Sequence, residues 1–300
     1  MNRTPPKQIR EFLRKEVNYG CPVQSCGSPY LTWHHFDPPW AEKNHHNTRG
    51  MIALCAEHAA QADGGRFTKD QLVEMKKNPY VSLDKISDFY GYLRRNVVCI
   101  IGNIAYNVES VLEINGEKVI SFRVDEEGYN RLNLMIRDSE GKPILTMEDN
   151  YWTAISRDIF DLSCSAQGKL LGIISKDKAT NFFMRFDDYP VDVFKEKLIK
   201  NSEKILSTSA AQNRFLSAKE IREMSIRSLK SSIERLISAM GSPSSIPTWT
   251  IKGKILWGDV HIEIRDAEIE DLRGHNLFGG SFIVGRKAGF GFSNKRITIG

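Results

Sequence analysis

The side chains best suited to bind metal or to move protons gather in one stretch of this 300-residue chain, residues 21–63. It holds three of the five cysteines and five of the seven histidines. Thiolates and imidazoles are preferred ligands of zinc, and an imidazole can also act as a general base near neutral pH. The order of these residues separates two kinds of chemistry: a cysteine-rich metal clamp and a pair of adjacent histidines.

Two short ligand steps predict a structural zinc site. Cys21 and Cys26 form a Cys-x4-Cys step in a turn with proline and glycine, and Cys55 and His58 form a Cys-x2-His step at the expected first turn of a helix. A Cys3His set is standard for a closed tetrahedral Zn2+, which a domain of about 60 residues needs as a staple. The alternative is four unrelated side chains. A thiol enzyme using Cys55 is disfavoured, because a zinc-bound thiolate is not free to attack.

The sequence around these ligands predicts the order strand, loop, strand, helix. The run LTWHHFDPPW is typical of a strand ending at His34 and His35, residues 51–54 of a second strand, and the residues near Cys55 of a helix start. Over residues 14–75 the segment resembles the HNH nuclease family, whose fold is a two-stranded ribbon and a helix around one catalytic metal. The resemblance rests on the Cys-x4-Cys step and on the runs WHHFDP and IALCAEH.

The resemblance implies roles for the two histidines. His34 would help to bind the catalytic metal, and His35 would be the general base that activates water to attack phosphorus. It also implies a catalytic Mg2+, Mn2+ or Ni2+ and a DNA substrate held by basic residues such as Arg49, Arg66 and Lys69. The chemistry is consistent, because an imidazole takes a proton near neutral pH and a divalent cation stabilises charge on the phosphate. The alternative is a surface or structural histidine pair.

One departure from the family's pattern is at Gly50. The family's asparagine, which holds the base in position, commonly lies five residues before the cysteine of the second strand, and Gly50 occupies that place. Asn47 is the neighbour that we expect to orient His35 through a backbone or side-chain contact. His45 and His46 are further candidates for this role.

A sharper departure is at Ala59. Zinc-containing members of the family usually carry a histidine there that binds the catalytic metal, and an alanine methyl cannot ligate a metal. Three explanations stay open. The chain is a naturally weakened nuclease, or Asp63, one helical turn later on the same face, replaces the missing ligand. The third explanation is that a histidine was deliberately changed to alanine to silence a toxic enzyme. The rest of the motif is intact, which favours this third explanation.

The composition excludes several classes of protein. Hydrophobic residues make up 41% and charged residues 26% of the chain, as in ordinary globular proteins. No apolar run reaches the roughly 18 to 20 residues that span a bilayer, and the polar N-terminal stretch lacks the apolar core of a secretory signal. We therefore expect a cytoplasmic protein with no membrane partner, in which clustered cysteines bind metal rather than form disulfides.

The net charge of +5 is unevenly distributed. Residues 1–96 carry a net charge of +4, residues 97–194 of −6, residues 195–235 of +5 and residues 236–300 of +2. Phosphate contacts come from clustered lysine and arginine, so only the first and third segments suit a polyanion. Solvated helix faces are the alternative explanation, above all for the third segment.

The remaining patterns predict a β-rich region with two inserted helices. Residues 97–186 alternate apolar and polar side chains between turn pairs, which indicates antiparallel strands. Residues 192–240 have helical periodicity, and residues 249–300 return to strands. We expect the two β segments to join in one sheet system or a short solenoid. Short helices are predicted at residues 7–17, at residues 69–77 after an N-cap at Thr68, and, as helix or linker, at residues 84–95.

The predicted fold class is therefore α+β. Residues 1–95 would form a small zinc-bound ββα-metal domain with flanking helices, and residues 96–300 a β-rich domain that regulates or oligomerises. The leading hypothesis is an HNH endonuclease that hydrolyses DNA, in a setting such as bacterial anti-phage defence that is inferred from the family alone. The rival is a zinc-stapled adaptor that binds DNA or protein without catalysis.

Overall fold

The computed structural model describes residues 2–81, 84–101, 103–209, 218–258, 260–264, 268–271, 276–279, 282–284, 290–293 and 296–299. The chain divides into two compact units. The first contains Met1–Gly91 and Ile136–Phe183, and the second contains Tyr92–Met135 and Met184–Gly300. The first unit therefore differs from residues 1–95, the range predicted for an N-terminal domain: its first segment ends at residue 91, and it also contains residues 136–183. Each unit is described by itself below.

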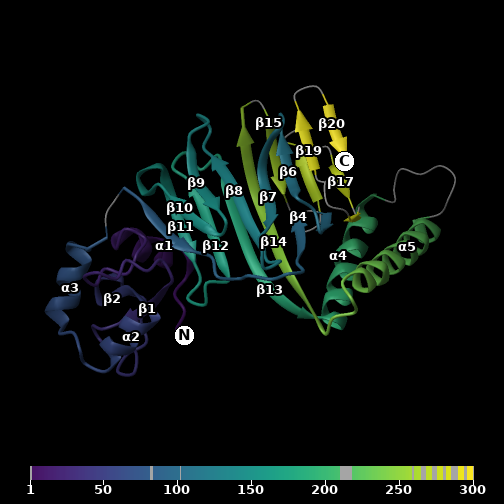
Figure 1. Ribbon diagram of the computed structural model, residues 1–300. Coiled ribbons are helices and arrows are strands. Elements are labelled where there is room, and N and C mark those ends of the chain that lie inside the picture. Colours follow the sequence, from purple (N-terminus) through teal and green to yellow (C-terminus); the bar gives the residue numbers. More distant parts are fainter. Residues whose placement is uncertain are drawn as a thin grey trace. The chain divides into compact units, whose positions relative to one another are not determined.

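The first unit begins with three helices and a two-stranded ribbon (Figure 1). Its elements before residue 92 are α1 (Lys7–Glu16), β1 (Leu31–His35), the 3-10 helix η1 (Thr48–Gly50), β2 (Met51–Cys55), α2 (Ala56–Asp63), α3 (Lys69–Lys77) and β3 (Ile86–Phe89). Its later elements are β9 (Pro143–Glu148), β10 (Tyr151–Ala154), the 3-10 helix η2 (Ser156–Asp158), β11 (Ile159–Cys164) and β12 (Leu170–Ser175).

The ribbon confirms the predicted order of strand, loop, strand and helix. β1 and β2 pair antiparallel, with His34 opposite Ile52 and His35 opposite Met51. α2 follows β2 without a loop. All five residues of β2 are buried, because its side chains belong to one core with residues of α1, α2 and α3. Leu13 of α1, Val17 at the C-cap of α1 and Leu72 of α3 are members of this core.

The predicted helix at residues 69–77 is confirmed, including its cap. The Thr68 side chain accepts a hydrogen bond from the Gln71 backbone N–H, and the Gln71 side chain accepts one from the Thr68 backbone N–H. This reciprocal capping box satisfies two amide groups that the first turn of a helix leaves open.

The short helix or linker predicted at residues 84–95 is wrong for residues 86–89, which form the strand β3. This strand pairs antiparallel with β10, which also pairs with β9. The pairing supplies backbone hydrogen bonds from residues about sixty positions away, and such contacts override local propensity. A buried ion pair joins other distant parts of the unit: the Arg14 guanidinium in α1 donates to both carboxylate oxygens of Asp161 in β11, at 2.9 and 2.6 Å.

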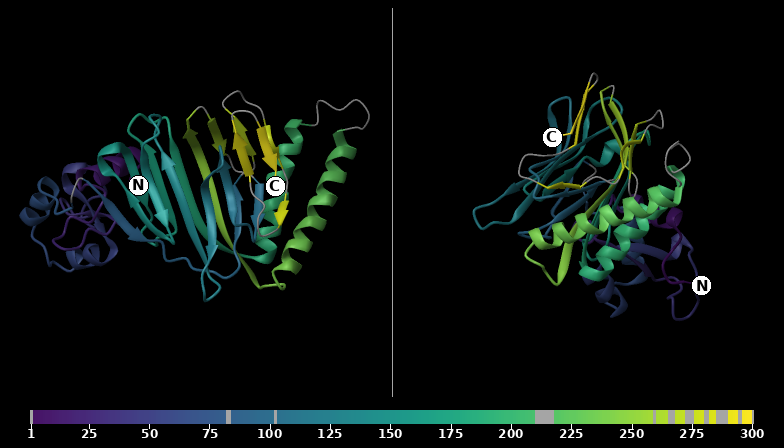
Figure 2. Two further views of the ribbon diagram at one scale, coloured as in Figure 1. Left: turned by 45° about the horizontal axis from the view of Figure 1, so that its top comes forward. Right: turned by 90° about the vertical axis from the view of Figure 1, so that its right-hand side faces the viewer.

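In its described residues, the second unit contains strands of two sheets and the helices α4 and α5 (Figure 2). Its elements are β4 (Val98–Ile101), β5 (Asn103–Tyr106), β6 (Ser110–Ile114), β7 (Glu117–Val124), α4 (Val191–Ser209), α5 (Ala218–Ala239), β14 (Ser245–Trp257), β15 (Val260–Ile264), β16 (Glu268–Asp271), β17 (Asn276–Gly279), β18 (Phe282–Val284), β19 (Phe290–Ser293) and β20 (Arg296–Ile299). Two further strands, β8 (Asn130–Arg137) and β13 (Asn181–Pro190), each contain a boundary between the units.

The two β segments predicted from the sequence do join. β4 pairs parallel with β14, β5 with β18, and β6 with β19, so strands from the early segment lie directly beside strands from the late one. Phe122 on β7 meets Trp249 on β14 edge to face at 6.3 Å, which packs one sheet on the other.

The predicted helical pair is present as α4 and α5, which lie side by side (Figures 1 and 2). Phe194 of α4 and Ile233 of α5 pack with Val98 of β4 in one core. None of the helices in the described part of the chain is both long and apolar enough to cross a membrane.

Candidate metal centre and histidine pair

The four predicted zinc ligands converge on one point. The ligand atoms of Cys21, Cys26, Cys55 and His58 all lie within 4.8 Å of one another. The two sulfurs of Cys26 and Cys55 are 3.9 Å apart, and His58 Nδ1 lies 3.4 Å from Cys21 Sγ and 3.2 Å from Cys55 Sγ. Tetrahedral zinc with bonds of about 2.3 Å to sulfur and about 2.0 Å to nitrogen separates two sulfurs by about 3.8 Å and a sulfur from a nitrogen by about 3.5 Å. The cluster therefore fits a metal ion such as zinc.

Local backbone structure explains this convergence. Between Cys21 and Ser28 the chain folds back on itself, with the Cys21 N–H bonded to the Ser28 carbonyl at 2.8 Å. Ser25 and Gly27 adopt positive φ angles of 64° and 66° in this turn. Cys55 is the N-cap of α2, and its sulfur accepts a hydrogen bond from the His58 N–H, which sets both ligands on one turn.

Burial changes the pKa values of two thiols in this cluster. It raises the pKa of Cys21 to about 12 and also raises the pKa of Cys55. Without a metal these thiols would keep their protons at neutral pH. Metal binding must therefore displace the protons, so occupancy of the site depends on pH.

His34 and His35 are neighbours in sequence but not in space. Successive side chains of a strand point to opposite faces, so the two imidazoles at the end of β1 cannot bind the same metal ion. Both are buried, with 6% and 3% of their surface exposed. His34 faces the end of α2, where its Nδ1 lies 3.2 Å from Asp63 Oδ1. Burial lowers the pKa of His34, although Asp63 acts in the opposite direction, so the net effect favours the neutral ring.

His35 lies under the segment between β1 and η1. Its ring centroid is 4.7 Å from that of Trp40, 5.2 Å from that of His45 and 6.0 Å from that of His46. Neither ring nitrogen has a hydrogen-bond partner among the described residues. Burial, followed by the nearby imidazoles of His45 and His46, lowers the pKa of His35 to about 4. The imidazole is thus neutral at pH 7, but a pKa of about 4 makes it a weak base, and the ring is covered.

Asn47 is connected to His35 through His45. The Asn47 backbone N–H donates to His45 Nδ1 at 3.1 Å, which leaves His45 Nε2 as the donor to the Pro38 carbonyl at 2.8 Å. The Asn47 side chain caps η1 by accepting a hydrogen bond from the Arg49 N–H. His45 is therefore held from both sides while its ring meets His35 nearly edge-on.

Close packing accounts for the glycine at position 50. A Cβ atom there would lie 1.7 Å from the Asp37 carbonyl oxygen, so no side chain fits. The Gly50 carbonyl accepts hydrogen bonds from the N–H groups of Phe36 and Asp37, at 2.9 and 3.2 Å. This corner of the ribbon depends on the close approach of two backbones, which excludes an asparagine at this position.

Ala59 is half-buried on α2 and packs against the core of the ribbon. It lies one turn before Asp63, so both residues are on one face of the helix.

Comparisons with known proteins assign no family to this chain. No protein-family model, curated protein or solved structure matches this chain.

The three predicted DNA-binding residues lie on different elements. Arg49 is exposed on η1, and Arg66 is exposed after α2, where it donates to the Gln61 side chain and lies over the Phe67 ring at 5.5 Å. Lys69, at the start of α3, pairs with Asp37 at 2.6 Å. Asp37 therefore offsets part of the positive charge of Lys69.

The sequence reasoning missed Lys76. Its buried ammonium group donates to the carbonyls of Thr48 and Met51 and pairs with Glu16 at 3.2 Å. Lys76 thus supports the start of β2, opposite His35. The signal was available: Lys76 is one helical turn after the buried Leu72, on the face of α3 that turns to the core.

Proposed function

We propose that this protein is a metal-dependent endonuclease of the HNH type that hydrolyses DNA phosphodiester bonds. The observation that carries the proposal is the approach of His34 Nδ1 and Asp63 Oδ1 to 3.2 Å, from β1 and from the end of α2. An imidazole nitrogen and a carboxylate oxygen are a donor pair suited to Mg2+, Mn2+ or Ni2+. Asp63 is 60% exposed, so this position is open to a phosphate from solvent.

The proposal assigns separate tasks to the residues of the ribbon. A bound divalent cation would stabilise negative charge on the phosphate and on the leaving oxygen. His35 takes the proton from the attacking water at one of its two unpartnered ring nitrogens. Since Trp40 and His46 cover this ring, the segment between β1 and η1 has to move before DNA reaches it. The zinc cluster holds β2 and α2 in place beneath both steps.

Among the three explanations of Ala59, the position of Asp63 favours the second. A carboxylate already lies beside His34, one turn after the residue where the family places a histidine. Two protein ligands hold a cation more weakly than three, so we expect slow cleavage. Arg49, Arg66 and Lys69 would contact the DNA phosphates around this position.

Nicking of supercoiled plasmid in Mg2+, Mn2+ or Ni2+ tests the proposal. The wild-type chain should nick slowly, and Ala59→His should nick at least about tenfold faster because a third ligand is added. His35→Ala, with unchanged zinc content, should be inactive. If Ala59→His neither cuts plasmid nor binds divalent cations more tightly, the assignment of this site is wrong.

The second candidate is a zinc-stapled adaptor that binds DNA or protein without cutting. It is favoured by the burial of His35, which is 3% exposed, and by the lack of a ligand at residue 59. It predicts that DNA is retained in a gel-shift assay by the wild-type chain and by Ala59→His alike. Neither protein would then produce nicked plasmid in any of the three metals.

A further inference from the structure

Two imidazoles of the first unit have buried nitrogen atoms that no hydrogen bond satisfies. His35 is 3% exposed, and neither of its ring nitrogens has a partner among the described residues. His46 is half-buried, and its Nδ1 likewise has no partner there. Buried nitrogen atoms are costly unless a hydrogen bond or a metal ion satisfies them, so this pair requires an explanation.

The spacing of the two rings suits one shared metal ion. The ring centroids of His35 and His46 are 6.0 Å apart. Zinc bound to two imidazoles through Zn–N bonds of about 2.1 Å places the ring centroids roughly 5 to 6.5 Å apart, depending on the angle at the metal. The observed separation lies inside that range, so binding requires no change in the distance between the rings.

Trp40 packs against both rings. Its ring centroid lies 4.7 Å from that of His35, and it stacks on His46 at 5.7 Å with 24° between the planes. Ligands that packing already holds lose little side-chain entropy when they bind a metal. Trp40 therefore preorganises the two imidazoles.

His45 is also close to His35 but is not available as a ligand. The two ring centroids are 5.2 Å apart. However, His45 Nδ1 accepts a hydrogen bond from the Asn47 N–H, and its Nε2 donates to the Pro38 carbonyl. The site that these rings allow thus has two protein ligands, and water completes the tetrahedron of a zinc ion.

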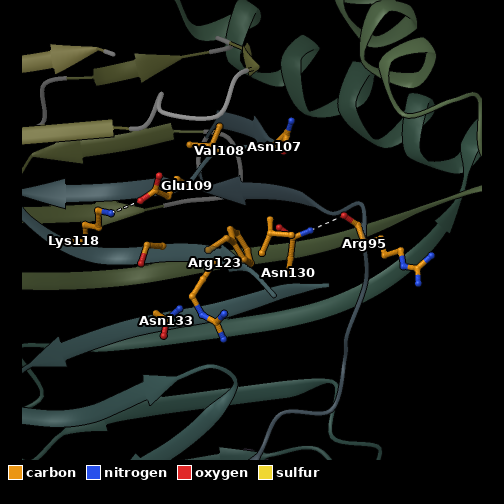
Figure 3. Close-up of a pocket in the computed structure, with 11 residues that line it drawn as sticks. Arg95, Asn107, Val108, Glu109, Lys118, Arg123, Asn130 and Asn133 are labelled. Carbon is orange, nitrogen blue, oxygen red and sulfur yellow. Dashed lines mark hydrogen bonds and ion pairs between the residues drawn. The ribbon is translucent and has the colours of Figure 1, made fainter. Parts of the chain in front are cut away.

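The polar side chains of a hollow in the second unit do not converge in this way (Figure 3). Its volume is about 630 Å³, and Lys118 pairs with Glu109 at 2.6 Å on one side of it. Asn130 donates to the Arg95 carbonyl, and Figure 3 shows the side chains of Arg95 and Arg123 extending away from one another. The cations of this hollow therefore do not meet at one ligand.

We propose that His35 and His46 together bind one Zn2+, at a position separate from the Cys3His cluster. Two imidazoles without a carboxylate suit Zn2+ and not Mg2+ or Mn2+, which prefer oxygen ligands. The site is also distinct from the pair of His34 and Asp63, because His34 and His35 point to opposite faces of β1.

The bound ion has a consequence for cleavage, and only this consequence rests on the proposed nuclease function. With zinc on one ring nitrogen and hydrogen on the other, His35 cannot take a proton from the attacking water. Micromolar Zn2+ should therefore slow nicking in Mg2+, and replacing His46 should relieve that inhibition.

Isothermal titration calorimetry with Zn2+ tests the site on the full chain, with the Cys3His cluster already loaded. The parent for this titration is Asp63→Asn, so that the pair of His34 and Asp63 does not add to the count. The parent should take up one further Zn2+ per chain. His46→Phe keeps an aromatic ring against Trp40 but has no nitrogen ligand. It should weaken binding of the further Zn2+ at least about tenfold, since even the loss of an outer-shell partner has that effect.

His261→Phe is the matched control, because it makes the same change at an exposed histidine of β15 in the second unit. The melting temperature of each zinc-loaded variant shows whether it has folded. The proposal is overturned if the parent binds no further Zn2+, or if a folded His46→Phe variant binds it as tightly as the parent. A chain that never nicks plasmid, but loses its further Zn2+ through His46→Phe, supports this site and contradicts only the nuclease proposal.

Discussion

The Cys3His cluster and the histidine pair both begin as short sequence steps, but the fold arranges their side chains differently. Four ligands from two segments about thirty residues apart converge to within 4.8 Å. His34 and His35 are adjacent, yet one faces Asp63 and the other faces Trp40. The comparison teaches that ligand spacing predicts a site only when the backbone turns the side chains together. A turn and a helix N-terminus do this for the cysteines, whereas a strand separates the two histidines.

Breaking the Cys3His cluster should have the largest effect on the first unit. Cys55→Ser removes a thiolate ligand but leaves a residue that can still cap α2, so zinc content should fall from one per chain to nearly none. The loss of structural zinc costs on the order of 10 kcal/mol in zinc-finger peptides, enough to unfold the ribbon and its flanking helices. Metal analysis and limited proteolysis measure both results.

Cys164→Ala is the control for this variant, since Cys164 is buried in β11 outside the cluster. It should keep its zinc. Full zinc content in Cys55→Ser would contradict the assignment of these four residues as a zinc site.

Removing the Lys76 ammonium group, which holds the start of β2 opposite His35, should have the next largest effect. Lys76→Met leaves the Thr48 and Met51 carbonyls and the Glu16 carboxylate without their buried ammonium partner. Removing one member of such a set costs about 3 kcal/mol, measured as the free energy of unfolding in urea. Zinc content should stay at one per chain, which would show that the Lys76 contacts stabilise the fold independently of the Cys3His cluster. Lys77→Met, at the exposed neighbouring position, should change stability by less than about 0.5 kcal/mol.

Gly50, which packs closely against the Asp37 backbone, should have a smaller effect on stability. Gly50→Ala puts a methyl group against the Asp37 carbonyl, and relieving this overlap should cost about 2 kcal/mol. Gly64→Ala is the matched glycine, because a Cβ there would meet its nearest atoms at 3.5 Å, an ordinary contact. Thermal melting compares the two variants. Equal melting temperatures would show that the corner is more pliable than the packing implies.

Residue types and local periodicity predicted much of the ribbon. The zinc ligands, the two strands, α2 and the capped α3 all follow from short-range patterns in residues 21–77. The pairing of β4 with β14 could be expected only as joined β segments, because nothing local encodes which of two distant strands become neighbours.

Other features of the site could not be predicted from spacing. The burial of His35 depends on how the segment with Trp40 and His46 folds over it, and that path is set by backbone contacts at Gly50 and Pro38. The Arg14–Asp161 pair joins residues 147 positions apart, and neither residue has a sequence signal that names its partner. Such contacts arise from packing rather than from local propensity.

The most direct measurement of the central claim is the affinity of the zinc-loaded chain for Mn2+, followed by electron paramagnetic resonance. Asp63→Asn keeps the size of the side chain but removes the charged ligand beside His34, so Mn2+ affinity should fall about tenfold or more. Glu57→Gln, on the first turn of the same helix, should leave it unchanged. Equal Mn2+ affinity in the wild type and Asp63→Asn, with one zinc per chain in both, would contradict a catalytic metal held by His34 and Asp63.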